Sequence, residues 1–142
     1  MYGTVDSPAS KGIPAPVYKL DDFAPTGPNA ANVTAIPDIQ SHLLLYQSPP
    51  LLDTTHTLNI SISNLTIGGP NFYFDFFTID VSTPEPMSHI LVDDRSSDIH
   101  YSGDWTDSHS FNSYLGTDRM AADSGNSIAT FAFTGTQALA FP

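Results

Sequence analysis

The sequence predicts an all-β fold, an antiparallel β-sandwich, from three observations. Nothing in the chain carries a sustained 3.6-residue hydrophobic period, so no long amphipathic helix is expected. Two segments instead alternate apolar and polar residues with the period of two that is typical of half-buried strands. Twelve prolines and nine glycines divide the 142 residues into short segments, as turns between strands require. The length corresponds to about one domain.

The N-terminal third favours extended structure over helix. Residues 1–37 contain six prolines, and the best candidate for a strand among them is Pro16 to Leu20. Residues 39–47 fit a short helix or a buried strand equally well, and Pro49-Pro50 ends either element. Of the two, the strand is preferred.

The strongest strand pattern covers residues 56–63. Leu58, Ile60 and Ile62 share one face, while polar side chains occupy the other. Residues 72–81 follow as a strand so aromatic that we expect both of its faces to be covered.

The C-terminal residues 128–134 alternate in the same way and place Phe131 and Phe133 on one face. Gly135 supplies a turn, and residues 138–141 form a return strand. We expect this segment and residues 72–81 to contribute to one core.

Two groups of motifs carry a resemblance to a known family. The later part of the chain holds Val92-Asp93-Asp94, Tyr101-Ser102-Gly103-Asp104-Trp105, Gly116-Thr117 and residues 127–136. The earlier part holds Tyr46-Gln47-Ser48-Pro49, residues 53–58 and Phe74-Asp75-Phe76-Phe77. The later group resembles the first half, and the earlier group the second half, of a galactose-binding-like jelly-roll module. Such modules recur in uncharacterised surface and transmembrane proteins of mushroom-forming fungi.

The order of the two halves is reversed relative to that module. Residues 1–81 therefore resemble its second half and residues 90–142 its first half, with a proline-broken linker at residues 82–89. Because the termini of such a jelly roll lie close together, the chain is either one permuted sandwich or two half-modules of a tandem array.

Charge and composition exclude some partners. The formal net charge is −11, and Asp supplies fourteen of the fifteen acids, which favours loops and turns. Only four Lys and Arg are present, so no nucleic acid partner and no anionic membrane partner is expected. No apolar run is long enough for direct membrane insertion by this chain. The chain contains no cysteine, and three sequons at Asn32, Asn59 and Asn64 indicate a glycoprotein of the secretory route.

An oxygen-rich group of Asp93, Asp94, Asp98 and Asp104 opens the later part of the chain. Hard cations such as Ca²⁺ bind about six to eight oxygens from carboxylates and carbonyls. The alternative is that these side chains cap turns, a position that Asp favours. The resemblance allows a structural calcium ion beside an early strand, with Asp93 and Asp94 as candidate ligands, and no other cofactor is expected.

Aromatic and carboxylate side chains gather between residues 101 and 115. An exposed ring beside a carboxylate is how a protein holds a sugar, although alternation places Trp105 and Tyr101 together on one packed face. The loop from Asp104 to Leu115 offers the richest set of candidate sugar ligands: Asp107, His109, Phe111, Asn112 and Tyr114.

No catalytic motif is present. The five histidines show no metal-binding pair at helical spacing, and no serine lies in a nucleophile elbow followed by triad partners. The sequence therefore predicts no enzyme. It predicts a non-catalytic module at the cell surface or outside the cell that binds carbohydrate or adheres, with cell-wall or glycoprotein sugars as partners. The alternatives are a structural spacer that binds no ligand and an accessory domain of a polysaccharide-active enzyme.

Overall fold

The computed structural model describes residues 4–5, 16–27, 40–41, 44–62, 71–81, 88–109, 113–121 and 126–141. Within these ranges the chain is all-β, and the one helical turn is a short 3₁₀ turn at Tyr114–Gly116. No helix of this described part is long and apolar enough to cross a membrane. The strands are β1 Thr4–Val5, β2 Val17–Leu20, β3 Gln40–Ser41, β4 Tyr46–Gln47, β5 Thr54–Ile62, β6 Phe72–Phe74, β7 Phe76–Val81, β8 Ser88–Asp93, β9 Ile99–Ser102, β10 Trp105–Ser108, β11 Asp118–Ala121, β12 Ser127–Gly135 and β13 Gln137–Phe141.

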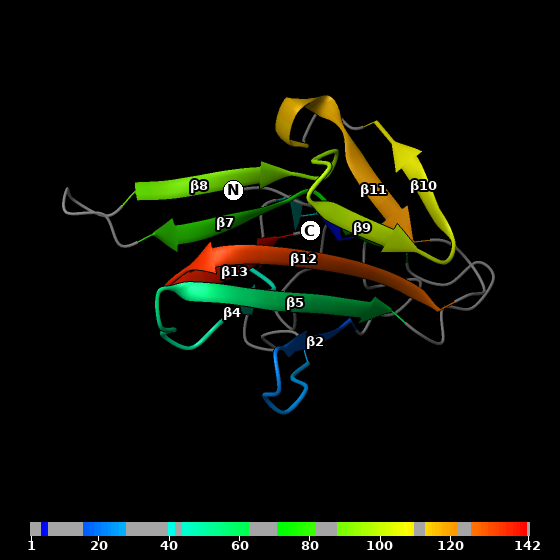
Figure 1. Cartoon of the computed structure of the whole chain (residues 1–142). Coiled ribbons are helices and arrows are strands. Elements are labelled where there is room, and N and C mark those ends of the chain that lie inside the picture. The colour runs from blue at the N-terminus through cyan, green and yellow to red at the C-terminus, as the bar shows by residue number, and fades with distance from the viewer. Residues whose placement is uncertain are drawn as a thin grey trace.

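The strands form three antiparallel sheets. One sheet has the order β2-β5-β12-β9, the second β4-β13-β7-β8 and the third β10-β11-β6-β1-β3. The pairing of β5 with β12 runs without interruption over nine residue pairs, from Thr54 and Gly135 to Ile62 and Ser127. This long ladder joins the earlier part of the chain to the later part, so the two parts share one structure (Figure 1).

Strands β6 and β7 join the second and third sheets into one layer, because a single residue, Asp75, separates them. β8 pairs with β7, and β11 pairs with β6. Both lie on the same side of the continuous β6–β7 segment, because the Thr117 hydroxyl, just before β11, donates to the Asp94 carboxylate, just after β8, at 3.1 Å. β13 and β1 therefore share the other side, opposite Phe76 and Phe72 respectively. The first and the last strand of the chain thus lie in line beside β6 and β7.

The core fills the space between this layer and the sheet of β5 and β12. Phe77 of β7 stacks on Phe131 of β12, with ring centroids 4.9 Å apart and planes inclined by 9°. At one edge of the sandwich, Tyr18 of β2 stacks on Tyr46 of β4 at 4.7 Å. The alternation in β5 buries His56, Leu58, Ile60 and Ile62 on the inner face, which completes a β-sandwich.

Most of the expected strands are present, with four differences. The aromatic strand expected over residues 72–81 is interrupted at Asp75. Before it, β6 lies between β11 and β1, and after it, β7 lies between β13 and β8. The linker expected at residues 82–89 ends earlier, because Ser88 already opens β8, which pairs with β7 as its antiparallel neighbour. Within residues 39–47 the described positions form two short strands.

The return strand after Gly135 exists, but it does not pair with the strand before it. β12 belongs to one sheet, while β13 pairs with β7 and β4 of the opposite layer. The chain therefore arches across the sandwich at Gly135 instead of forming a hairpin. A Cβ atom at this position would lie 2.5 Å from Ile79 Cγ2 and 2.7 Å from the Asp80 carbonyl oxygen, so only glycine fits the arch.

We predict that Gly135→Ala lowers the free energy of unfolding by about 1–3 kcal/mol, because the methyl group overpacks the arch. Gly27→Ala is the matched control, since no heavy atom lies within 4 Å of its added Cβ. Urea denaturation of both variants checks this expectation. Equal stability of the two variants would contradict the close approach of β7 to the arch.

Candidate metal centre

Asp75 lies in the middle of the molecule, where the β6–β7 line changes partners. Its side chain is fully buried, with 0% exposure, between the aromatic residues of both strands. The backbone N–H of Tyr114 donates to both carboxylate oxygens, at 3.0 and 2.9 Å. Asp75 thereby anchors the short 3₁₀ turn that precedes β11.

Two further carboxylates meet Asp75 at this point. β8 ends at Asp93 opposite Phe76, and Asp94 follows it with 1% exposure. One carboxylate oxygen from each of Asp75, Asp93 and Asp94 lies within 4.8 Å of the others. The three side chains thus present oxygen atoms to a common point.

A further carboxylate, Asp118, opens β11 and is buried, with 2% exposure. Its Oδ2 accepts the Ser113 hydroxyl, whereas its Oδ1 is buried without a hydrogen-bond partner. Asp93 Oδ1 is likewise buried without a partner. Buried polar atoms are normally paired, so each of these oxygens is suited to accept a proton or a ligand, and Asp93 lies close enough to Asp94 to share a proton with it. We call Asp75, Asp93, Asp94 and Asp118 the carboxylate cluster.

Electrostatics within the cluster are unfavourable for four ionised groups. Burial, together with the charges of the other three carboxylates, raises the pKa of Asp75 to about 8, against the lowering effect of the Tyr114 N–H. Burial and the neighbouring charge of Asp93 raise the pKa of Asp94. Uncompensated buried charge is costly, and it is relieved either by protons or by a bound cation.

The nearby arginines give little compensation among the described residues. Arg95 Nε donates to Asp93 Oδ2 at 3.2 Å from an exposed position. The guanidinium of Arg119 lies over the Tyr101 ring, with Cζ 4.9 Å from the centroid. Arg119 Nε is also 3.2 Å from Asp107 Oδ1, an ion-pair distance without the alignment of a hydrogen bond.

The donor set is suited to a hard cation. All of its ligand atoms are oxygens, and Ca²⁺ prefers carboxylate and carbonyl oxygens in a flexible geometry. A hollow of about 80 Å³ reaches the cluster from the surface, and Asp94 and Asp118 line it together with Arg95, Asp107, Ser108, His109 and Thr117. Pockets for organic ligands measure roughly 300–1,000 Å³, so this hollow is of a size for an ion and its water.

The structure places the expected metal ligands in two different settings. Asp93 and Asp94 belong to the cluster, whereas Asp98 and Asp104 are exposed. Asp98 lies in a turn, where its backbone N–H donates to the Ser96 hydroxyl at 3.3 Å. The turn interpretation therefore holds for Asp98.

Sequence reasoning missed Asp75 and Asp118. A signal for Asp75 was present, because an acid within a strand covered on both faces must be buried. Asp118 gives no such signal: it reaches the cluster only because β11 pairs with β6, which places Arg119 opposite Phe74.

Two of the five expected sugar ligands line the hollow, and Asp107 belongs to strand β10, which occupies residues 105–108 of the segment expected to be a loop. The two are Asp107 and His109, and both are exposed. Tyr114 is half-buried and packs on Phe76, with ring centroids 5.3 Å apart. Phe111 and Asn112 lie outside the described residues.

The aromatic pair Tyr101 and Trp105 packs as expected from alternation. The two rings meet edge to face, with centroids 5.1 Å apart, and Trp105 also contacts Phe72. The indole N–H points to the backbone carbonyl of Ile128, at 3.2 Å. Trp105 therefore serves the core instead of offering a stacking face to solvent.

Of the three sequons, only Asn59 lies within the described residues. Its side chain is half-buried on the outer face of β5, and its Oδ1 accepts the Thr130 hydroxyl at 2.8 Å. Asn32 and Asn64 fall outside the described ranges.

Comparison with known protein families, with curated proteins and with solved structures gave no match to this chain. The role of the carboxylate cluster is therefore argued from its geometry and chemistry.

We predict that, with a chelator present, stability falls as the pH rises from about 4 to 8. The folded-state pKa of Asp75 lies above its unfolded value of 3.8, so in this window the folded chain binds a proton that the unfolded chain has lost. Asp75→Asn keeps an acceptor for the Tyr114 N–H and removes the charge. This variant should be more stable than the wild type at pH 8 in chelator, by a few kcal/mol.

Urea denaturation at pH 5 and pH 8 measures this difference. Asp98→Asn is the matched control, since Asp98 is exposed and should not change the pH dependence. A destabilised Asp75→Asn variant at pH 8 in chelator would contradict a costly buried charge.

Proposed function

We propose that this chain is a non-catalytic extracellular module of galactose-binding-like fold that binds carbohydrate or adheres, and that Ca²⁺ in the carboxylate cluster stabilises it. The observation that carries the proposal is the pair of buried, unpartnered carboxylate oxygens, on Asp93 and Asp118, beside the fully buried Asp75. Protons or a divalent cation relieve such buried charges, and a donor set made only of oxygens suits Ca²⁺.

The cluster supports a binding role because of what it holds in place. Asp75 fixes the backbone of Tyr114, and Asp118 fixes the Ser113 side chain, so the start of the 3₁₀ turn depends on the cluster. A cation there would hold the 3₁₀ turn and the start of β11, beside Asp107 of β10 and His109 just after it. Loops on a rigid scaffold are the usual place for ligand contacts.

The mouth of the hollow can contact one or two hydroxyl groups of a sugar but cannot enclose the whole ring. Its volume of about 80 Å³ is too small for a pyranose, but the exposed Asp107 carboxylate and His109 can accept or donate hydrogen bonds to sugar hydroxyls. The remainder of the sugar would then lie on the outer surface of the loop.

Calcium is expected to raise the melting temperature by about 10 °C when its free concentration is about 100 times Kd, because it binds only the folded chain. Asp94→Asn and Asp118→Asn should lose this shift, and Asp98→Asn should keep it. Differential scanning calorimetry with calcium or with chelator tests this. Identical melting temperatures of the wild type under both conditions would contradict the cation site.

Carbohydrate binding is tested by titrating galactose, glucans and chitin fragments into the wild type and two variants, Asp107→Ala and Tyr114→Ala. Millimolar affinity corresponds to about −4 kcal/mol, so losing one charged hydrogen bond should weaken binding about tenfold or more. Chemical-shift changes in NMR spectra measure it. An absence of shifts with every sugar would contradict the binding role and favour a structural spacer.

A further inference from the structure

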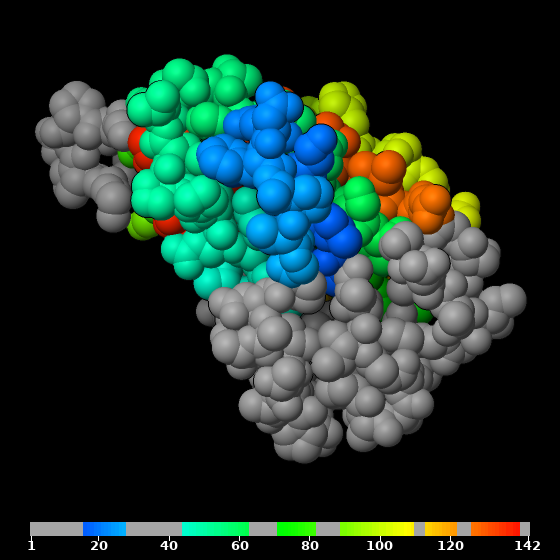
Figure 2. All heavy atoms as spheres, turned by 90° about the horizontal axis from the view of Figure 1, so that it is seen from below, coloured from blue at the N-terminus to red at the C-terminus, as the bar shows by residue number. Residues whose placement is uncertain are grey.

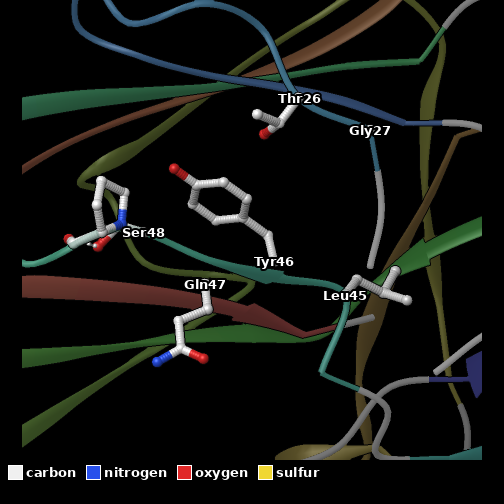
Figure 3. A pocket seen from close by; sticks show the side chains of 7 residues that line it. Thr26, Gly27, Leu45, Tyr46, Gln47 and Ser48 are labelled. Carbon is white, nitrogen blue, oxygen red and sulfur yellow. Dashed lines mark hydrogen bonds between the residues drawn. The ribbon is translucent and has the colours of Figure 1, made fainter. Parts of the chain in front are cut away.

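A second concave site lies on the opposite edge of the sandwich, between the loop of residues 23–27 and the segment of residues 45–49. One part has a volume of about 410 Å³, and an adjoining part of about 240 Å³ shares Thr26, Tyr46, Gln47 and Pro49 with it. We call both parts together the edge groove. Figure 3 shows the Tyr46 side chain within it, facing Thr26 across the space. β4 forms the edge of its sheet farthest from β8, so the groove is remote from the carboxylate cluster.

The walls of the edge groove are held by the fold. Thr26 and Tyr18 exchange two backbone hydrogen bonds, at 2.8 and 2.9 Å, which close the loop onto β2. Asp21 fixes the start of the same loop to β5, because its carboxylate accepts the Thr57 N–H and pairs with His56, both at 2.7 Å. The view of Figure 2 shows this loop region, in blue, lying against the chain of residues 44–62.

The floor is equally fixed. Ser48 donates its backbone N–H to the Ala138 carbonyl and accepts the Ala138 N–H on its hydroxyl, at 2.9 and 3.0 Å. Tyr46 is 7% exposed and stacks on Tyr18. The groove is thus formed before any ligand arrives, which reduces the entropic cost of binding.

The chemistry of the edge groove differs from that of the rest of the surface. The chain carries fifteen acids, yet every described residue that lines the groove is uncharged: Tyr18, Leu20, Phe23, Ala24, Thr26, Gly27, Leu45, Tyr46, Gln47, Ser48 and Pro49. The lining itself is neutral, although burial, together with the charge of Asp21 at the start of the loop, raises the pKa of Tyr46.

Two hydroxyl groups are free to bind a ligand. Within the described part of the chain, neither the Thr26 hydroxyl nor the Tyr46 hydroxyl makes a hydrogen bond, and Figure 3 shows the two across the space of the groove. Apolar surface lies beside them, since Phe23 is 53% exposed and lines the adjoining part.

We infer that the edge groove binds a neutral sugar ring, as a second carbohydrate site that needs no metal ion. A sugar presents apolar C–H groups and hydroxyls in one rigid ring, which match the apolar Phe23 and Pro49 and the hydroxyls of Thr26 and Tyr46. The larger part of the groove falls within the range of about 300–1,000 Å³ typical of small-ligand pockets. This inference rests on the proposed carbohydrate-binding function and assigns it a different place.

The test is a titration of the full chain by NMR, in chelator, with galactose, glucose and N-acetylglucosamine oligomers as separate probes. At least one probe should shift resonances of residues 18–27 and 45–49. Tyr46→Phe removes one hydroxyl and keeps the stack on Tyr18, and Thr26→Val removes the other. Each should weaken binding about fivefold, the value of one neutral hydrogen bond.

Thr55→Val is the matched control, because Thr55 is exposed on β5 outside the groove lining, and it should leave affinity unchanged. Sugar binding that needs calcium and is lost in Asp107→Ala but kept in Tyr46→Phe would overturn the edge groove while supporting the first site. Shifts of the groove by a neutral peptide but by no sugar would also overturn it. Sugar-induced shifts in chelator that both groove variants weaken would support the groove even if the metal-dependent site failed.

Discussion

The structure depends on the burial of one carboxylate at the point where a strand changes its neighbours. β6 and β7 form one line through the centre of a layer, and the line passes from one sheet to the next at Asp75. Asp75 belongs to neither strand, and its side chain is fully buried. Its negative charge must be balanced locally, because water does not reach it.

The balance involves segments from three regions of the chain. β8 ends at Asp93, β11 begins at Asp118, and the 3₁₀ turn offers the N–H of Tyr114. Their meeting joins the later part of the chain to the β6–β7 line. Electrostatics at this point and the topology of the sandwich are therefore coupled: whatever neutralises the cluster also stabilises the junction of two sheets.

The two candidate sites differ in what holds them together. The loop beside Asp107 depends on a cluster of like charges, which a cation or protons must neutralise. The edge groove depends on backbone hydrogen bonds and on the stacked pair Tyr18 and Tyr46, which need no ligand for their own stability. The lining of the edge groove is uncharged, although its loop is also held by the ion pair of Asp21 with His56.

Sequence patterns predicted the elements whose two faces differ. Strand β5 alternates between core and solvent, so Leu58 and Ile60 revealed both its existence and its buried face. The break at Asp75 could not be found in this way, because a segment covered on both faces has no alternation to interrupt. The arch at Gly135 was also missed, since a hairpin and a crossing between sheets use the same local turn signal.

The residues of the two candidate sites could likewise be predicted only where they are neighbours in the sequence. Asp93 and Asp94 are adjacent in the sequence and were found, whereas Asp118 joins them only through the pairing of β11 with β6. The edge groove combines β2 and β4 from different sheets, and Tyr46 lies in a segment that fits helix and strand alike. The sequence shows which residues can bind a ligand, but it does not show which of them come together. That depends on the order of the strands in each sheet, which has no local sequence pattern.

The most direct test of a cation at the junction is crystallography with anomalous scattering, on crystals grown at pH 8 with saturating calcium chloride. We predict an anomalous peak between Asp75, Asp93 and Asp94, with carboxylate oxygens at roughly 2.3–2.6 Å from it. An ordered cluster without such a peak, in which the carboxyl groups hydrogen-bond to one another or to water alone, would contradict a calcium-stabilised junction.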